Sequence, residues 1–382
     1  MRSLNQEIEE IRQAHLFRRI TPVEFEADGV MRIDGKDYVN FSSNNYLAIA
    51  QDPRLKEAAN AATQEFGAGS GASRLVTGSL QIHHRLENKI AEFKGTEAAL
   101  LFNSGYHANL GILTAMLREG DEVYSDALNH ASIVDGCRLS RATVKVYRHS
   151  DASHLESLLR ESNGVSRRLI VTDSIFSMDG DAAPLRDLAD LAEKYETWLF
   201  VDEAHATGVC GPNGKGLVEE VWPGERPAYL RERLIQMGTL GKALGSFGAY
   251  AAGSRELVEF LVNLSRPFIY TTALPPGVSA ASLAALQIVE KEPERRRKLW
   301  GNIRFLREKL FPDAVAAASP IFPFIVGDSQ KALDISQRLK ESGFWVTAIR
   351  HPTVARGTER LRITLTAAHT KEQIESLIGH LR

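Results

Sequence analysis

Short apolar segments rich in β-branched residues alternate with longer segments of helical spacing over the first two thirds of the chain. In residues 185–196, for example, leucine and alanine recur every three or four positions, which is typical of a helix packed on one face. Strands that alternate with helices predict βαβ units, and hence a mainly parallel sheet covered by helices. The predicted strands span residues 98–103, 121–126, 143–148, 168–174, 197–204 and 234–239.

The pattern changes near residue 280. A long helix is expected to begin around residues 271–282, and the apolar segments beyond it indicate strands of a smaller α+β unit. We therefore expect a helical N-terminal segment (1–40), a large α/β domain (41–280) and a small C-terminal α+β domain (281–382). The later predicted strands lie within residues 319–327, 344–350 and 360–367.

Composition narrows the classes of function. The 46 basic residues are balanced by 48 acidic ones, for a net charge of −2, so no positive field favours nucleic acid. No apolar run is long enough to span a membrane, and the charged N-terminus lacks the apolar core of a secretory signal. With Cys137 and Cys210 as its only cysteines, the chain has no disulfide framework, and we expect a cytoplasmic location.

The sequence VDEAH at residues 201–205 contains the DEAH letters of a helicase motor. Such a motor also needs a G-x-x-x-x-G-K-[ST] loop to bind the nucleotide phosphates and magnesium. The lysines that follow a glycine, Lys36, Lys215 and Lys242, all lack the first glycine of that loop and the following Ser or Thr. The motif therefore does not indicate an ATP-driven motor.

Asp202 ends an apolar predicted strand, where an ionised carboxylate is costly unless a positive hydrogen-bonding group meets it. A protonated heteroaromatic nitrogen is one such partner. His205 follows three residues later, and Lys242 lies among small residues that leave room for a bulky group on its amine. An aspartate, histidines and a lysine in this arrangement suit pyridoxal phosphate, whose pyridinium needs an acidic partner and whose aldehyde needs an amine.

The chain resembles the α-oxoamine synthases, pyridoxal-phosphate enzymes with the aspartate-aminotransferase fold. This resemblance implies a mainly parallel seven-stranded sheet flanked by helices, with a smaller C-terminal α+β domain. The motifs that carry it run in order through nearly the whole chain: NFSSNNYL (40–47), FGAGSGASRLVTG (66–78), LFNSGYHAN (101–109), NHASIVDG (129–136), IFSMDGD (175–181), VDEAHATGV (201–209), GTLGKALG (238–245), IYTTALPP (269–276) and LRITLTAAHT (361–370).

The resemblance implies a role for each residue around the cofactor ring. Lys242 would bind the cofactor covalently and then act as acid and base at the substrate α-carbon. Asp202 would pair with the pyridine nitrogen, and His130 would stack on the ring. Ser177 and His205 would bond the phenolic oxygen.

A second group of residues is expected to bind the cofactor phosphate. Gly105 and Tyr106 open a predicted helix after a strand, where free backbone amides and the helix dipole suit a phosphate. By resemblance Thr239 also contacts it, and Thr271 and Thr272 reach the phosphate of a neighbouring subunit. The resemblance therefore implies a homodimer with shared active sites.

The substrate residues follow from the resemblance as well. Arg362 would bind the amino acid carboxylate, for which a bidentate guanidinium is the geometric fit. Asn44, Arg18 and Thr353 match substrate-side positions, and Arg350 is expected to help receive an acyl-chain carboxylate. The best match is the branch that condenses L-alanine with a pimeloyl thioester, carried on coenzyme A or acyl carrier protein, in biotin synthesis.

Three positions depart from the usual family pattern. Asp173 stands in place of a glutamate, Ala206 in place of a glycine and His351 in place of a proline. We expect no metal: His83, His84 and Glu87 lie close enough on a predicted helix to suggest a pair of metal ligands, but no further ligand is evident.

Other functions stay open at this stage. Glycine C-acetyltransferase, 5-aminolevulinate synthase and serine palmitoyltransferase share the core motifs and differ in amino acid and acyl group. A catalytically silent scaffold is a further alternative, and the joint presence of Lys242, Asp202, His130 and His205 argues against it. The NHAS motif disfavours a plain aminotransferase.

Overall fold

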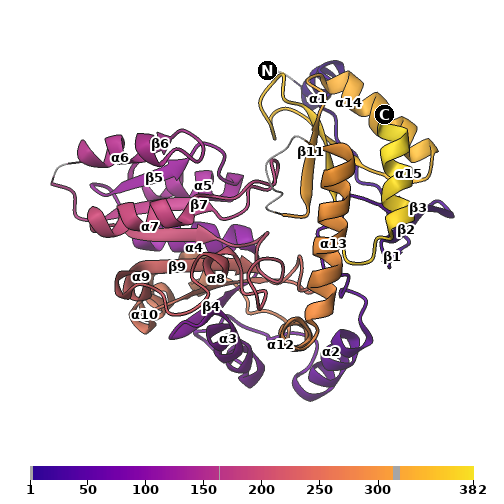
Figure 1. Ribbon diagram of the computed structural model, residues 1–382. Coiled ribbons are helices and arrows are strands. Elements are labelled where there is room, and N and C mark those ends of the chain that lie inside the picture. The colour runs from indigo at the N-terminus through magenta and orange to yellow at the C-terminus, as the bar shows by residue number, and fades with distance from the viewer. Residues whose placement is uncertain (1–2, 163, 313–318) are drawn as a thin grey trace. The chain divides into compact units, whose positions relative to one another are not determined.

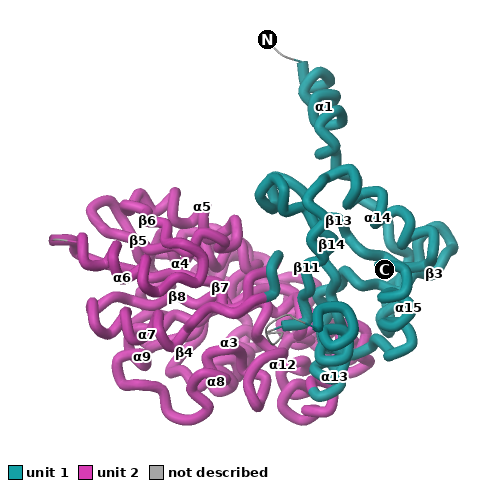
Figure 2. Tube along the Cα trace, turned by 45° about the horizontal axis from the view of Figure 1, so that its top comes forward, with its two compact units in different colours: residues 1–48, 178–180, 297–382 teal, residues 49–177, 181–296 magenta. Residues whose placement is uncertain are grey.

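The protein divides into two compact units, shown in different colours in Figure 2. The computed structural model describes residues 3–162, 164–312 and 319–382. Unit 1 comprises residues 1–48, 178–180 and 297–382, and unit 2 comprises residues 49–177 and 181–296.

Unit 2 is built around a seven-stranded sheet with the order β4-β10-β9-β8-β7-β5-β6. Figure 1 labels β4, β5, β6, β7 and β9 of this sheet. The neighbouring pairs are parallel except those made by β10, which runs antiparallel to both β4 and β9. The mainly parallel seven-stranded sheet that the sequence predicted is therefore confirmed. Its strands are β4 (Ala98–Phe102), β5 (Glu122–Asp126), β6 (Thr143–Tyr147), β7 (Arg168–Asp173), β8 (Trp198–Asp202), β9 (Leu234–Thr239) and β10 (Ala249–Gly253).

The central strands are buried on both faces, because helices cover both sides of a parallel sheet. Along β5, every residue is buried, and along β8 all but the first. Ile133 and Leu261, on two different helices, belong to one apolar cluster with Phe200 and Met237 of the strands. The core of unit 2 thus fixes the ends of β8 and β9, where the candidate residues lie.

The helices of unit 2 follow the spacing expected from the sequence. In α7, the buried residues Leu185, Leu188, Ala189 and Ala192 recur at intervals that place them on one face. The helices are α2 (Pro53–Phe66), α3 (Gln81–Lys94), α4 (Gly105–Met116), α5 (Ala131–Ser140), α6 (Ala152–Arg160), α7 (Leu185–Lys194), α8 (Leu217–Val221), α9 (Ala228–Arg233), α10 (Arg255–Leu264), α11 (Arg266–Ile269) and α12 (Pro276–Lys291).

Unit 1 combines both ends of the chain around two small sheets. One sheet has the order β1-β2-β3-β12, and the other β11-β14-β13. The parallel pairing of Val39 with Phe344 joins the N-terminal strands to the C-terminal part. Its elements are α1 (Leu4–Gln13), β1 (Phe25–Ala27), β2 (Val30–Ile33), β3 (Lys36–Asn40), α13 (Pro293–Leu310, most of whose length lies in this unit), β11 (Ile321–Ile325), α14 (Ser329–Glu341), β12 (Phe344–Trp345), β13 (Thr347–Ile349), β14 (Arg360–Thr364) and α15 (Lys371–Leu381).

The structure divides the chain differently from the three segments that the sequence suggested. Residues 3–40 contain one helix and three strands, and they belong to the same unit as the C-terminal residues because β3 pairs with β12. The boundary expected at residue 280 falls inside α12, which is continuous to Lys291, and the division lies after Arg296. Strand β10 was missed, because its alanine-rich sequence AYAAG has little of the β-branched character of a strand.

Among the described residues, no helix is both long and apolar enough to cross a membrane.

Candidate active site

Seven of the residues predicted from the sequence line one cavity of about 190 Å³ in unit 2. They come from the N-terminal end of α4, the start of α5, and the chain just after β8 and β9. In an open α/β sheet, this edge beyond the carboxyl ends of the strands is the usual place for a ligand. The seven residues are Gly105, Tyr106, His130, Asp202, His205, Thr239 and Lys242.

Asp202 is the last residue of β8 and is only 3% exposed. Its Oδ1 accepts a hydrogen bond from the backbone N–H of Ala204 at 2.9 Å, and its Oδ2 accepts one from Asn109 Nδ2 at 2.9 Å. Both donors are neutral, so these hydrogen bonds do not balance the negative charge of the carboxylate. A cationic ring nitrogen in the cavity would supply the compensation that a buried carboxylate requires.

His130 caps the N-terminus of α5. Its backbone N–H donates to Asp173 Oδ2 at 2.7 Å, and its Nδ1 lies 2.7 Å from Ser132 Oγ. Burial lowers the pKa of His130, and the Lys242 charge lowers it further, while Asp202 opposes the shift. The imidazole is therefore neutral near pH 7, as suits a ring that stacks on another ring.

Asp173 also lines the cavity, at the end of β7 and beside Asp202 in the sheet register. Burial raises its pKa, and the charge of Asp202 raises it further. This aspartate, which stands where the family pattern has glutamate, thus holds the backbone of His130 through a direct hydrogen bond.

Lys242 Nζ lies 2.9 Å from His205 Nε2, so an amine and an imidazole face each other inside the cavity. Lys242 sits in a tight turn in which the N–H of Gly245 donates to the Lys242 carbonyl at 3.0 Å. Gly245 has φ +61°, and a Cβ there would approach the backbone N of Ala50 to 2.5 Å. Only glycine fits this turn, which fixes the direction in which the lysine enters the cavity.

The N-terminus of α4 forms a third wall. Ser104 caps the helix through the N–H of His107, which leaves the first-turn amides of Gly105 and Tyr106 at the cavity. A Cβ on Gly105 would lie 2.8 Å from Thr239 Cγ2, so a side chain there would fill the space between helix and strand end. A helix N-terminus with a hydroxyl beside it suits a phosphate.

Ser177, Thr271 and Thr272 were predicted to bind the cofactor and do not line this cavity. Ser177 lies in a loop closed by the bridge between Ile175 and Ala182. Asn103 Nδ2 donates to Thr271 Oγ1 at 3.3 Å and to the Thr272 carbonyl at 2.9 Å.

The predicted substrate residues lie in unit 1 and form two groups there. Arg362 is 7% exposed and donates through both terminal nitrogens to Asn44 Oδ1, at 3.2 and 3.3 Å. Arg18 Nη2 donates to Thr353 Oγ1 at 3.5 Å, and Arg350 donates to the carbonyl of His15.

The second of these groups is cationic. Burial lowers the pKa of Arg350, and the charge of Arg18 lowers it further. Two neighbouring guanidinium groups that repel each other suit an anion placed between them.

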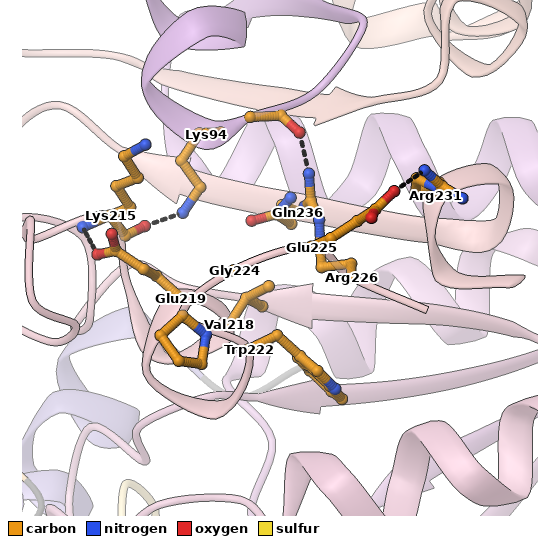
Figure 3. Close-up of a pocket in the computed structure, with 12 residues that line it drawn as sticks. Lys94, Lys215, Val218, Glu219, Trp222, Gly224, Glu225, Arg226, Arg231 and Gln236 are labelled. Carbon is orange, nitrogen blue, oxygen red and sulfur yellow. Dashed lines mark hydrogen bonds and ion pairs between the residues drawn. The ribbon is translucent and has the colours of Figure 1, made fainter. Parts of the chain in front are cut away.

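A second cavity of about 200 Å³ lies elsewhere in unit 2, and several of its charged side chains are paired within the protein (Figure 3). Lys94 bonds Glu203 and the Lys215 carbonyl, and Arg231 pairs with Glu225. These contacts indicate a structural network rather than a second reaction site.

The three residues considered as metal ligands are engaged otherwise. His83 Nε2 lies 2.8 Å from the Leu274 carbonyl, and Glu87 forms a bidentate ion pair with Arg74. Within the described residues, no group of three His, Cys, Asp or Glu side chains could hold a metal ion.

The profile of the family described as aminotransferase class I and II matches residues 36–381. The chain belongs to this family. Among the most similar curated members is 8-amino-7-oxononanoate synthase of Symbiobacterium thermophilum, which is 47% identical over 98% of this chain and 95% of that protein. The synthase of the same name from Anaeromyxobacter dehalogenans (strain 2CP-1) is 49% identical over 98% of this chain and 93% of its own.

A comparison with solved structures agrees with the fold. Serine palmitoyltransferase from S. paucimobilis, with a bound PLP-myriocin aldimine, superposes with a TM-score of 0.91 and 30% identity, over 99% of this chain and 95% of that chain.

The cavity of this family member fits pyridoxal phosphate. It offers an amine, a buried carboxylate held by neutral donors, a neutral imidazole and a helix N-terminus on separate walls. The amide of Asn109 also reaches it, and the buried Asn109 Oδ1 has no partner among the described residues.

Sequence reasoning missed four lining residues: Asn109, Ser132, Ala204 and Met237. Asn109 and Ser132 lie within quoted motifs, LFNSGYHAN and NHASIVDG, so a motif-wide interpretation could have included them.

Proposed function

We propose that this chain condenses L-alanine with a pimeloyl thioester, releasing carbon dioxide, to give 8-amino-7-oxononanoate and the free thiol of the acyl carrier. The observation that carries the chemistry is the meeting of Lys242, Asp202, His130 and His205 in one cavity. The choice of substrates rests on the relatives at 47% and 49% identity that carry the name 8-amino-7-oxononanoate synthase.

Bound pyridoxal phosphate acts as an electron sink, which makes the α-proton and the carboxylate of a joined amino acid easier to remove. Lys242 would hold the cofactor through its amine and would then serve as the base that takes the proton from the alanine α-carbon. Asp202 would keep the pyridine nitrogen protonated, and the neutral imidazole of His130 would pack against the ring. His205, 2.9 Å from Lys242 Nζ, would donate to the phenolic oxygen, and the resemblance assigns the same role to Ser177.

The remaining residues bind and orient. The amides of Gly105 and Tyr106 and the hydroxyl of Thr239 hold the phosphate. Arg362, oriented by Asn44, binds the alanine carboxylate before it is lost as carbon dioxide.

The acyl chain is held at its far end. Its terminal carboxylate is bound by the cationic group of Arg18 and Arg350, with Thr353 beside them.

We further propose a cytoplasmic homodimer in which Thr271 and Thr272 contribute to the phosphate site of the partner subunit. Thr272 forms a bridge with Ser73, and the chain on either side exposes large apolar residues. Val76 is 74% exposed and Tyr270 71%, which favours their burial in an interface. Light scattering during gel filtration tests the dimer, and a monomer at micromolar concentration would contradict it.

Release of free thiol tests the proposed reaction. Protein supplied with pyridoxal phosphate is mixed with pimeloyl-CoA, or with pimeloyl-acyl carrier protein, and with L-alanine, glycine or L-serine in separate reactions. We expect turnover with L-alanine and a pimeloyl thioester, and none in Lys242→Ala. Turnover only with glycine and a short acyl-CoA, or only with L-serine and a long-chain acyl-CoA, would assign the chain to another branch.

A further inference from the structure

Asn109 links two cavity residues that come from different elements, Asp202 at the end of β8 and Ser132 on α5. It lies on α4, is 1% exposed, and donates through Nδ2 to both Asp202 Oδ2 at 2.9 Å and Ser132 Oγ at 2.8 Å. Both hydrogens of its amide group are therefore in use. Ser132 in turn lies 2.7 Å from Nδ1 of His130. A continuous path of hydrogen bonds thus joins the Asp202 carboxylate to the His130 ring.

The direction of each hydrogen bond in this path follows from Asp202. An ionised carboxylate only accepts, so the amide nitrogen of Asn109 must face it, and the same nitrogen donates to Ser132 Oγ. The hydroxyl hydrogen of Ser132 is then available for His130 Nδ1, which also accepts from the Ser132 backbone N–H at 3.3 Å. Nδ1 is therefore the acceptor, and the proton of the neutral ring lies on Nε2.

In this orientation of the Asn109 amide, the side-chain oxygen accepts no hydrogen bond from the described residues. Asn109 Oδ1 is buried without a partner among the described residues. A buried amide oxygen without a donor is unfavourable, so the contacts at the nitrogen must outweigh it. Asp202 and Ser132 are those contacts.

We propose that Asn109 is a positioning residue that sets the orientation of the Asp202 carboxylate and, through Ser132, fixes the Nε2–H tautomer of His130. The inference rests on the proposed function, in which Asp202 meets the pyridine nitrogen and His130 covers the ring. One side chain would then hold both groups in register with the cofactor.

The test compares Asn109→Ala, Asn109→Asp and Ser132→Ala, each loaded with pyridoxal phosphate. Asn109→Ala removes a donor from Asp202, so that carboxylate is protonated more easily and activity falls most at low pH. We expect kcat to fall about 10- to 100-fold, with KM for L-alanine within about threefold of wild type. The visible absorbance of the bound cofactor should change over the same low-pH range.

Asn109→Asp is nearly the same shape and gives the opposite pH dependence. A protonated carboxyl at this position can donate to Asp202, whereas an ionised one cannot and repels it. Its activity should therefore fall as pH rises. This variant also keeps the inference testable if Asn109→Ala does not fold.

Ser132→Ala removes only the branch toward His130. It should reduce kcat less than Asn109→Ala, and the double variant should lose less than the product of the two single effects, because both act on one path. Besides Asp202, the charges of Lys242 and Asp135 shift the pKa of His130. The charges of Asp202, Lys242 and Asp126 shift the pKa of Asp173 beside it. All of these residues stay unchanged in the three variants.

Thr114→Ala is the matched control on the same helix, because the Thr114 hydroxyl donates to the Leu110 carbonyl of its own helix at 2.7 Å. Its kcat, pH profile and absorbance should match wild type. The inference is overturned if Asn109→Ala behaves like this control, or if Asn109→Ala and Asn109→Asp share one pH profile. Failure of the proposed function would look different: wild type itself would not release thiol.

Discussion

The ion pair between Lys94 and Glu203 predicts a large loss of stability when one partner is removed. The two side chains are 1% and 0% exposed, and Lys94 also bonds the Lys215 carbonyl. In Lys94→Met, the carboxylate of Glu203 stays buried with the Val218 N–H, at 2.9 Å, as a remaining donor. A stranded buried charge of this kind costs about 3–5 kcal/mol. We therefore expect the free energy of unfolding to fall by that amount.

Lys89, on the same helix, provides a matched control. It pairs with Glu92 and Glu290, but its side chain is 18% exposed and that of Glu92 is 69% exposed. Pairs that are partly open to solvent contribute about 0–1 kcal/mol each, so Lys89→Met, which removes two of them, should lose no more than about 2 kcal/mol.

The assay is urea unfolding at one fixed concentration of pyridoxal phosphate, since a ligand that binds only the folded state shifts the midpoint. A double variant, Lys94→Met with Glu203→Gln, should recover much of the loss, because it removes the stranded charge and keeps an acceptor for Val218. Equal losses in Lys94→Met and Lys89→Met would refute the reasoning, as would a double variant less stable than Lys94→Met.

Three further predictions concern the loops and the site. Hydrogen bonds to Asp126 at 2.9 Å and to Asp181 at 2.7 Å raise the pKa of His149 to about 10. The contribution of His149 to stability is therefore complete below about pH 6.5 and is lost as pH rises through 10. The difference in melting temperature between wild type and His149→Gln should shrink over this range, and a constant difference would contradict the prediction. Gly105→Ala should weaken binding of pyridoxal phosphate, measured by its absorbance on titration, because the new Cβ meets Thr239 Cγ2 at 2.8 Å; unchanged affinity would show that the phosphate lies elsewhere. Arg362→Lys should raise KM for L-alanine by about tenfold or more, because lysine cannot make a bidentate contact with a carboxylate, and an unchanged KM would remove Arg362 from the proposed carboxylate site.

Much of the cavity could be predicted from the sequence because its residues lie at the ends of recognisable strands. Asp202 closes the apolar strand β8, and Lys242 follows β9 by three residues. The periodicity that defines a buried strand also locates its carboxyl end, and parallel strands bring such ends to one edge. The family motifs added the roles of the individual residues, which periodicity does not contain.

Contacts between distant segments were decided by the tertiary structure alone. Asn109 and Asp202 are 93 positions apart, and Lys94 and Glu203 are 109 apart. The pairing of Val39 with Phe344 likewise placed the N-terminal segment in the C-terminal unit. Hydrophobic periodicity records which face of an element is buried, but not which other element covers that face. The sequence therefore determined which groups meet at this edge of the sheet, and only the packed fold decided which side chains orient them.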